Sequence, residues 1–337
     1  MKNKFLRNEL LLTLLALFVV IVPGLLINLG VIDAYIAQII TLAGVNSIMA
    51  ISVNAVCGIT GQLSLGQAGF MAIGSYSTII LTQTLGIPMA ISIILAALIT
   101  VIFGILIGFP TLKLQGDYLA IVTLGFGEII RVLLVNFKGL TGGANGLQFT
   151  TILAARSDYA YYLVIGVLVI VIVLLLNFVR STYGRAILAV RDDEIAANSN
   201  GIDVFKYKMI GFAIASFIAG IGGALYAPFM GFVKPDLASF NRSIDYLIFV
   251  VLGGMGSITG SVIAAFVLTF LQEFLRFLQD YRLLIYPLIL IFVMLFRPEG
   301  LLGTKEISFV KLWDKIMSFS KNKRKKNIVA EKEGGNE

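Results

Sequence analysis

The sequence contains no histidine and only one cysteine, Cys57, among its 337 residues. These shortages exclude a haem site with a histidine ligand, a Ser-His-Asp triad, a Cys-His nucleophile pair and a disulfide within the chain. They also leave a zinc ion without its usual nitrogen and sulfur ligands. We therefore expect no catalytic residues, no metal site and no cofactor, and we predict that the chain is not an enzyme.

Charged residues are scarce as well, at 13% of the chain, whereas an ordinary soluble domain carries about 25%. Hydrophobic residues make up 58%, which excludes both a typical soluble protein and a disordered one. The apolar residues occur in runs of about 18 to 22, the length at which a helix crosses a bilayer core of about 30 Å. An outer-membrane barrel would show short alternating segments instead. The composition therefore predicts an all-α polytopic membrane protein.

Ten hydrophobic segments are interpreted as transmembrane helices. They lie at residues 9–29, 35–57, 67–85, 89–109, 118–136, 160–179, 209–230, 244–260, 261–279 and 283–297. The first is expected to be a retained helix, because its apolar stretch is longer than the core of a signal peptide. Glycine clusters in the third and eighth segments predict broken helices there.

The distribution of the 26 Lys and Arg residues predicts the orientation of the chain. With the N-terminus inside, nine lie in cytoplasmic segments, ten in the C-terminal tail, five outside and two within spans. Cytoplasmic loops are enriched in Lys and Arg, so we predict N-in and C-in. Residues 1–305 would form the transmembrane domain and 306–337 a basic cytoplasmic tail. The tail is expected to lie near anionic membrane lipid, and we expect no nucleic-acid partner.

Two segments are rich in glycine at membrane depth. The first, Cys57–Phe70, carries four glycines with Thr60, Gln62, Ser64 and Gln67 between them, and the second is Gly253–Gly260. Such segments are typical of unwound helix along a transport path. They are equally typical of close helix packing through small residues. The sequence leaves both interpretations open.

Ionisable pairs occur within two predicted spans at a spacing of three residues. Glu128 precedes Arg131, and Glu273 precedes Arg276. An unpaired charge in a membrane is costly, so each pair is expected to form an ion pair. They could line a polar path or stabilise contacts between helices. The external loop 137–158 is Gly-rich, and either a connector or a docking surface fits it.

The loop 180–208 is the longest predicted internal connection between spans. Within it, acidic residues precede a short helical stretch at Glu194–Ala197, and Gly201 is a plausible stop signal. A helix this short buries too little area to fold alone. We therefore expect it to need a partner surface.

Taken together, these motifs resemble the permeases of branched-chain amino acid ABC importers, of the LivM type. The matching segments are Gly61–Tyr76, Leu114–Gly127, Leu140–Gly146, Tyr183–Ala186, Arg191–Ala197 and Gly253–Ser261. They appear in the family's order over roughly residues 40–300.

The resemblance implies several partners: a second related permease, two cytoplasmic ATP-binding subunits and an extracytoplasmic solute-binding protein. It also implies that the loop at 180–208 contains a helix that couples the chain to the ATPases. The implied coupling residues are Arg185, Arg191, Asp193, Glu194, Ala197 and Gly201. Glu194 lies one residue too far from Gly201 for the general importer pattern. The chain has no Gly-Lys dipeptide and so no P-loop, and ATP hydrolysis would belong to separate subunits.

The leading hypothesis is therefore ATP-driven import of leucine, isoleucine and valine by alternating access. The pathway is expected to be lined by small and amide side chains: Asn46, Asn54, Gln62, Ser64 and Gln67. An importer of urea or short amides from the same family is an alternative. A stand-alone secondary transporter or a passive channel would belong to a different class.

Overall fold

The computed structural model describes residues 20–114, 116–150, 157–297, 300–301 and 303. The chain divides into two units, and every element named below belongs to the unit Gly24–Glu306. Most of the predicted first span, 9–29, lies outside the described residues, although residues 20–28 are helical. The predicted tail, 306–337, lies outside them entirely.

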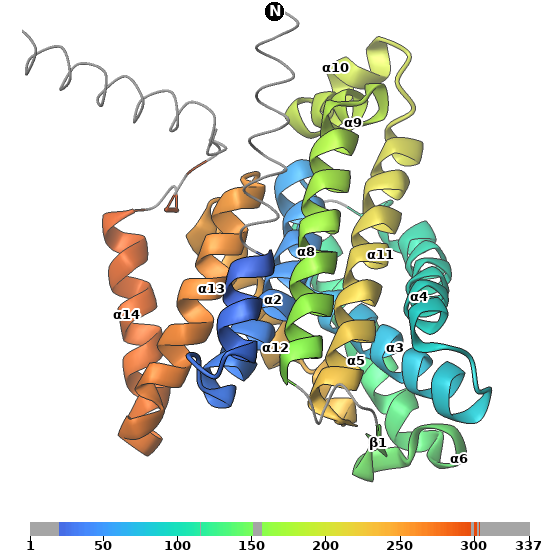
Figure 1. Ribbon diagram of the computed structural model, residues 1–337. Helices are drawn as coiled ribbons and strands as arrows, with labels where there is room; N and C mark the ends of the chain where they lie inside the picture. The colour runs from blue at the N-terminus through green and yellow to red at the C-terminus, as the bar shows by residue number, and fades with distance from the viewer. Residues whose placement is uncertain (1–19, 115, 151–156, 298–299, 302, 304–337) are drawn as a thin grey trace, which may run out of the picture. The chain divides into compact units, whose positions relative to one another are not determined.

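Three helices form the buried centre of this unit: α2 (Ala34–Asn54), α3 (Gln67–Ile79) and α11 (Val204–Met230) (Figure 1). Glycines on α3 and α11 let the two backbones meet, since a Cβ at Gly74 would lie 2.9 Å from the Cα of Gly220. Small residues have this role where helices associate without a hydrophobic driving force. Close packing through small residues is therefore present at the centre of the fold.

Apolar helices surround this centre with large side chains on their outer faces. The helix α4 (Met89–Thr111) packs on α11 and α3, and α13 (Ile258–Phe274) packs on α2. The apolar windows of α5 (Asp117–Asn136) and α8 (Ser157–Arg180) are only 28% buried, against 72% for that of α2. Exposed Ile, Leu and Phe side chains of this kind suit contact with lipid.

Six described helices are long and apolar enough to cross a membrane: the segment containing α2, then α4, α5, α8, α11 and the segment containing α13. They confirm that six of the predicted spans are helices of sufficient length and hydropathy. The predicted spans 67–85, 244–260 and 283–297 correspond to shorter helices, namely α3, α12 (Phe240–Gly253) and α14 (Arg282–Phe296).

The first glycine-rich segment interrupts the helical structure, which is one of the two interpretations that the sequence left open. After α2 the chain forms a π-helix, η1 (Ala55–Ile59), and residues 61–66 are not helical. Gly61 has a φ of +71°, a conformation that glycine adopts without steric cost. The break precedes the predicted third span instead of falling within it. That span continues from α3 into a second π-helix, η2 (Ile80–Thr84).

The break predicted within the eighth segment is confirmed, but the predicted boundary between the eighth and ninth segments, after residue 260, is wrong. The helix α12 ends at Gly253, where Gly254 and Gly256 have φ values of +108° and +91°. The next helix, α13, begins at Ile258, and the Ser257 hydroxyl caps it by accepting a hydrogen bond from Gly260 N at 3.1 Å. A window of hydropathy cannot detect this stop, because the residues on both sides of it are apolar. From α13 the chain continues through η5 (Leu275–Tyr281) to α14.

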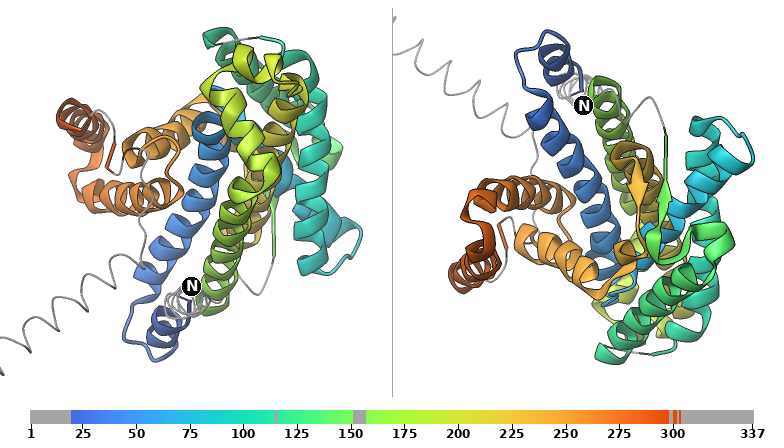
Figure 2. Two further views of the ribbon diagram at one scale, coloured as in Figure 1. Left: turned by 90° about the horizontal axis from the view of Figure 1, so that it is seen from above. Right: turned by 90° about the horizontal axis from the view of Figure 1, so that it is seen from below.

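A short antiparallel ladder joins two connections at one end of the unit. The strand β1 (Leu147–Gln148) pairs with β2 (Phe232–Val233), with Leu147 opposite Val233 (Figure 2). Between α5 and β1 lie α6 (Lys138–Thr141) and η3 (Gly143–Asn145), and η4 (Pro235–Ala238) follows β2. The described part of the Gly-rich loop is therefore ordered and paired rather than a loose connector.

Both predicted ion pairs are confirmed. Arg131 Nε lies 2.6 Å from Glu128 Oε2, and Arg276 Nη1 lies 2.9 Å from Glu273 Oε1. Each carboxylate also reaches another helix: Glu128 accepts a hydrogen bond from Phe240 N, and Glu273 accepts one from the Tyr35 hydroxyl. These contacts favour a structural role in joining helices.

Candidate functional site

Two short helices, α9 (Thr182–Asp192) and α10 (Glu194–Ser199), occupy the end of the unit opposite the ladder (Figure 1). The Asp193 carboxylate caps α10 by accepting hydrogen bonds from Ile195 N and Ala196 N, both at 2.9 Å. Gly201, with a φ of +79°, follows its end. The helix predicted at Glu194–Ala197 is thus confirmed.

The helix α9 was not predicted from the sequence, although two signals mark it. The Ser181 hydroxyl caps it by accepting from Gly184 N at 3.2 Å, and Ile187 and Val190, three residues apart, are buried. On α10, Ala197 is buried whereas Ile195 is 82% exposed. The short helix therefore presents a large apolar side chain outward, which suits a partner surface.

Among the predicted coupling residues, Arg191 forms a hydrogen bond to a residue that is far away in the sequence. Its Nη1 donates to the carbonyl oxygen of Gly58 at 3.0 Å, and its Nη2 lies 2.8 Å from Asp192 Oδ1. A Cβ at Gly61 would lie 2.6 Å from Arg191 Cγ. Arg191 thus ties α9 directly to the first glycine-rich segment. Arg185 instead bonds locally, to the carbonyl oxygen of Arg180 at 2.8 Å.

The two glycine-rich segments contact each other at the same place. Asn54 Oδ1 accepts a hydrogen bond from Gly256 N at 2.8 Å. A Cβ at Gly58 would lie 2.9 Å from the Cα of Gly256, so only glycine fits there. Sequence reasoning identified both segments, but it gave no reason to expect this contact.

The five predicted pathway residues are all buried, with at most 7% of any residue exposed. Asn46 Nδ2 donates to Thr269 Oγ1 at 3.0 Å, and Gln67 Oε1 lies 3.0 Å from the Ser52 hydroxyl. Ser64 is 1% exposed.

Amide atoms of three of these residues have no hydrogen-bond partner in the described part of the chain. They are Asn54 Nδ2, Gln67 Nε2 and both amide atoms of Gln62. Buried polar atoms are nearly always paired, so four unpaired atoms in one region require an explanation. They would be satisfied by a polar solute or by water.

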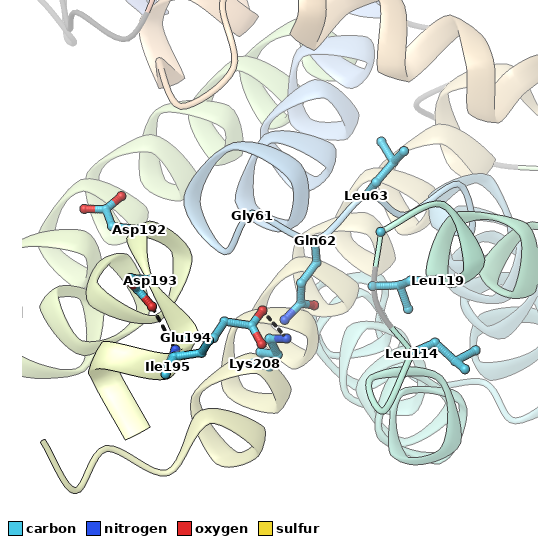
Figure 3. Close-up of a pocket in the computed structure, with 11 residues that line it drawn as sticks. Gly61, Gln62, Leu63, Leu114, Leu119, Asp192, Asp193, Glu194, Ile195 and Lys208 are labelled. Atoms are coloured by element: carbon cyan, nitrogen blue, oxygen red, sulfur yellow. Dashed lines mark hydrogen bonds and ion pairs between the residues drawn. The ribbon is translucent and has the colours of Figure 1, made fainter. Parts of the chain in front are cut away.

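A pocket of about 390 Å³ lies where the first glycine-rich segment, the start of α5 and the helices α9 to α11 meet. Figure 3 shows its lining side chains. The lining residues are Gly61, Gln62, Leu63, Leu114, Gly116, Leu119, Asp192, Asp193, Glu194, Ile195 and Lys208. The pocket therefore brings together one predicted pathway residue, Gln62, and two predicted coupling residues, Asp193 and Glu194.

Sequence reasoning missed Lys208 as a site residue. It is 8% exposed, and its ammonium forms an ion pair with the Glu194 carboxylate. The sequence offers one indication that Lys208 is a site residue: it lies immediately before the predicted apolar span that begins at residue 209. The ion pair connects α10 to the first turns of α11.

Two substitutions to leucine are expected to act in opposite directions. Asn54→Leu removes the acceptor of the Gly256 N–H and should destabilise the fold by about 1–3 kcal/mol. Gln62→Leu replaces two unpaired buried atoms by apolar ones of similar size and should leave stability unchanged or raise it. Thermal unfolding of the purified full-length chain compares them, and a lower midpoint for Gln62→Leu than for Asn54→Leu contradicts this description.

Comparison with known proteins shows that the chain is similar to the members of one family. The model described as branched-chain amino acid transport system / permease component matches residues 35–294. The LivM permease of Salmonella typhimurium is 36% identical, covering 86% of this chain and 74% of the relative. The LivM permease of Escherichia coli is 35% identical, covering 88% and 75%. The LivH permease of Salmonella typhimurium is 25% identical, covering 80% and 95%. No solved structure gives a significant match.

Proposed function

Because the chain belongs to the family of branched-chain amino acid transport permeases and is a multi-pass protein of the cell membrane, we propose that it is the permease subunit of an ATP-driven ABC importer. Its substrates would be leucine, isoleucine and valine. ATP hydrolysis would take place on separate subunits, and the permease would work by alternating access.

The proposed arrangement has ten spans, with the N- and C-termini and the loop 180–208 in the cytoplasm. Residues 1–305 form the permease domain and 306–337 the basic tail. Similarity to both LivM and LivH permeases supports pairing with a second, related permease. Two ATP-binding subunits would contact α9 and α10, and a solute-binding protein would deliver substrate on the other side.

One observation carries the mechanistic part of this proposal. The segment expected to contact the ATPases is the one whose Arg191 reaches the carbonyl oxygen of Gly58 and whose Glu194 lines a pocket together with Gln62. A displacement of α9 and α10 would therefore act directly on the first glycine-rich segment, which contains Gly58 and three of the predicted pathway residues. Chains of hydrogen-bonded and packed side chains carry coupling between sites in many proteins, and the contacts of Arg191 and Glu194 support such a route here.

Reconstituted transport tests the proposed function. We expect proteoliposomes that contain this chain, its partner permease, two ATP-binding subunits and the binding protein to accumulate radiolabelled leucine only with ATP. Vanadate should stop the uptake and ionophores should not. Isoleucine and valine should compete, whereas urea and acetamide should not.

Two results would contradict the proposal. Uphill uptake by this chain alone, collapsing with an ion gradient and insensitive to vanadate, would identify a secondary transporter. Competition by urea or acetamide as strong as that by isoleucine would identify an importer of amides.

A further inference from the structure

We infer that the pocket between residues 61–63, the start of α5 and α10 is a binding site for a free amino acid, with Lys208, Glu194 and Gln62 contacting its α-carboxylate and α-ammonium groups. The choice of leucine as the ligand rests on the proposed function. The site itself rests on the pocket's geometry and chemistry.

A charge pair with spare bonding capacity lies in the pocket, formed by buried Lys208 and by Glu194, whose side chain is 40% exposed. The ammonium of Lys208 has three donors and the carboxylate of Glu194 has about four acceptor positions, so their mutual ion pair leaves most of both unused. The other two carboxylates are engaged, because Asp193 caps α10 and Asp192 pairs with Arg191. Lys208 and Glu194 can therefore each bind one charged end of a zwitterion.

Gln62 supplies an independent indication of a ligand. The residue is only 4% exposed, both atoms of its amide are unpaired within the described chain, and its side chain extends toward Lys208 and Glu194 (Figure 3). A primary amide donates through nitrogen and accepts through oxygen. A ligand that satisfies both must carry an acceptor and a donor close together, as the carboxylate and ammonium of an amino acid do.

The opposite wall of the pocket is aliphatic. Leu63, Leu114 and Leu119 lie on the side away from Glu194 and Lys208 (Figure 3). A volume of about 390 Å³ falls within the range of about 300–1,000 Å³ for small-molecule sites. The polar wall and the leucine wall together match a zwitterion that bears a branched aliphatic side chain.

The charges that line the pocket favour an amino acid over a ligand with only a carboxylate or with no charge. Three carboxylates and one ammonium line the pocket, so a ligand that carries only a carboxylate is repelled. A neutral amide such as urea leaves Lys208 and Glu194 without a new charged partner. Because α10 and residues 61–63 both contribute to the lining, a bound amino acid would contact the coupling segment and the unwound segment at once.

Protection of an introduced cysteine tests this site directly. In a Cys57→Ser background, Leu114→Cys places a single thiol on the leucine wall, and Tyr118→Cys places one on the same chain segment at a position that is 74% exposed and outside the lining. Each full chain is assembled with its partner permease and ATP-binding subunits in nanodiscs, without the binding protein. The rate of modification by a polar maleimide is then measured.

We expect millimolar leucine to slow modification of Leu114→Cys at least about fivefold and to leave Tyr118→Cys unchanged. The same concentrations of 4-methylpentanoate, which lacks the ammonium, and of urea should not protect. Adding Gln62→Leu should abolish protection without lowering the unfolding temperature. Lys208→Met should also abolish protection by leucine. It serves as the test of the site if Gln62→Leu fails to fold.

Three results would overturn the inference: no protection of Leu114→Cys by leucine, equal protection of Tyr118→Cys, or protection by urea as strong as that by leucine. ATP-driven uptake, measured in the same preparations with the binding protein added, separates the two proposals. Uptake without protection refutes the amino acid site alone, and protection without ATP-driven uptake refutes the proposed importer.

Discussion

Gly223→Ala is expected to destabilise the protein by about 3 kcal/mol, although it adds only one methyl group. A Cβ at Gly223 would overlap the carbonyl oxygen of Met71 and lie 3.0 Å from Ser75 N, both in the backbone of α3. Backbone cannot move aside as a flexible side chain can. The Ser75 hydroxyl also donates to the carbonyl oxygen of Gly223 at 2.8 Å, and separating the helices would break that bond.

Gly166→Ala is the matched control, because it makes the same change in α8 where a new Cβ meets nothing within 4 Å. Alanine is favoured over glycine within a helix by about 1 kcal/mol, so this variant should be neutral or slightly more stable. Unfolding midpoints in detergent should differ by roughly 5–10 °C between the two variants. Equal midpoints would show that α3 and α11 are not packed as closely as described.

Arg191→Met is expected to lower ATP-driven leucine uptake by about tenfold or more while ATP hydrolysis by the assembled complex continues. The side chain joins α9 to the first glycine-rich segment, through the carbonyl oxygen of Gly58 in η1. Methionine retains the apolar stem beside Gly61 but cannot donate. ATP hydrolysis would then move α9 and α10 without moving the segment beside the pathway.

Arg185→Met is the control for this experiment. Arg185 is on the same helix and was also predicted to be a coupling residue, but within the described residues its side chain bonds to Arg180 and Thr182, at the corner between α8 and α9. Its uptake should remain within about twofold of the unmodified complex. Equal losses in both variants, or unchanged uptake with Arg191→Met, would remove the assigned role of the contact between Arg191 and Gly58.

Features that depend on neighbouring residues could be predicted from the sequence. Apolar runs predicted six helices that the structure confirms as long enough to span a membrane. The Asp193 cap and the Gly201 stop predicted α10, because caps act on residues two or three positions away. A spacing of three residues predicted the ion pair of Glu128 with Arg131.

Features that depend on distant parts of the chain could not be predicted. The contact between Asn54 and Gly256 spans about two hundred residues, and nothing local to either segment specifies the other. The strands β1 and β2 are two residues each, too short to show a period in the sequence. Lys208 becomes a site residue only because α10 folds back over the start of α11 and brings Glu194 to it.

The ladder between β1 and β2 has a mechanical consequence. It fixes the chain just after α11, at Phe232 and Val233, to the connection that follows α5. The starts of α5 and α11 flank the amino acid pocket at the other end. If the ladder stays intact while the two helices tilt apart, their separation grows with distance from it. Over the length of α5, about 30 Å, a swing of about 10° opens a gap of about 5 Å at the far end. A small tilt of the helices about the ladder would therefore cause its largest displacement at the pocket.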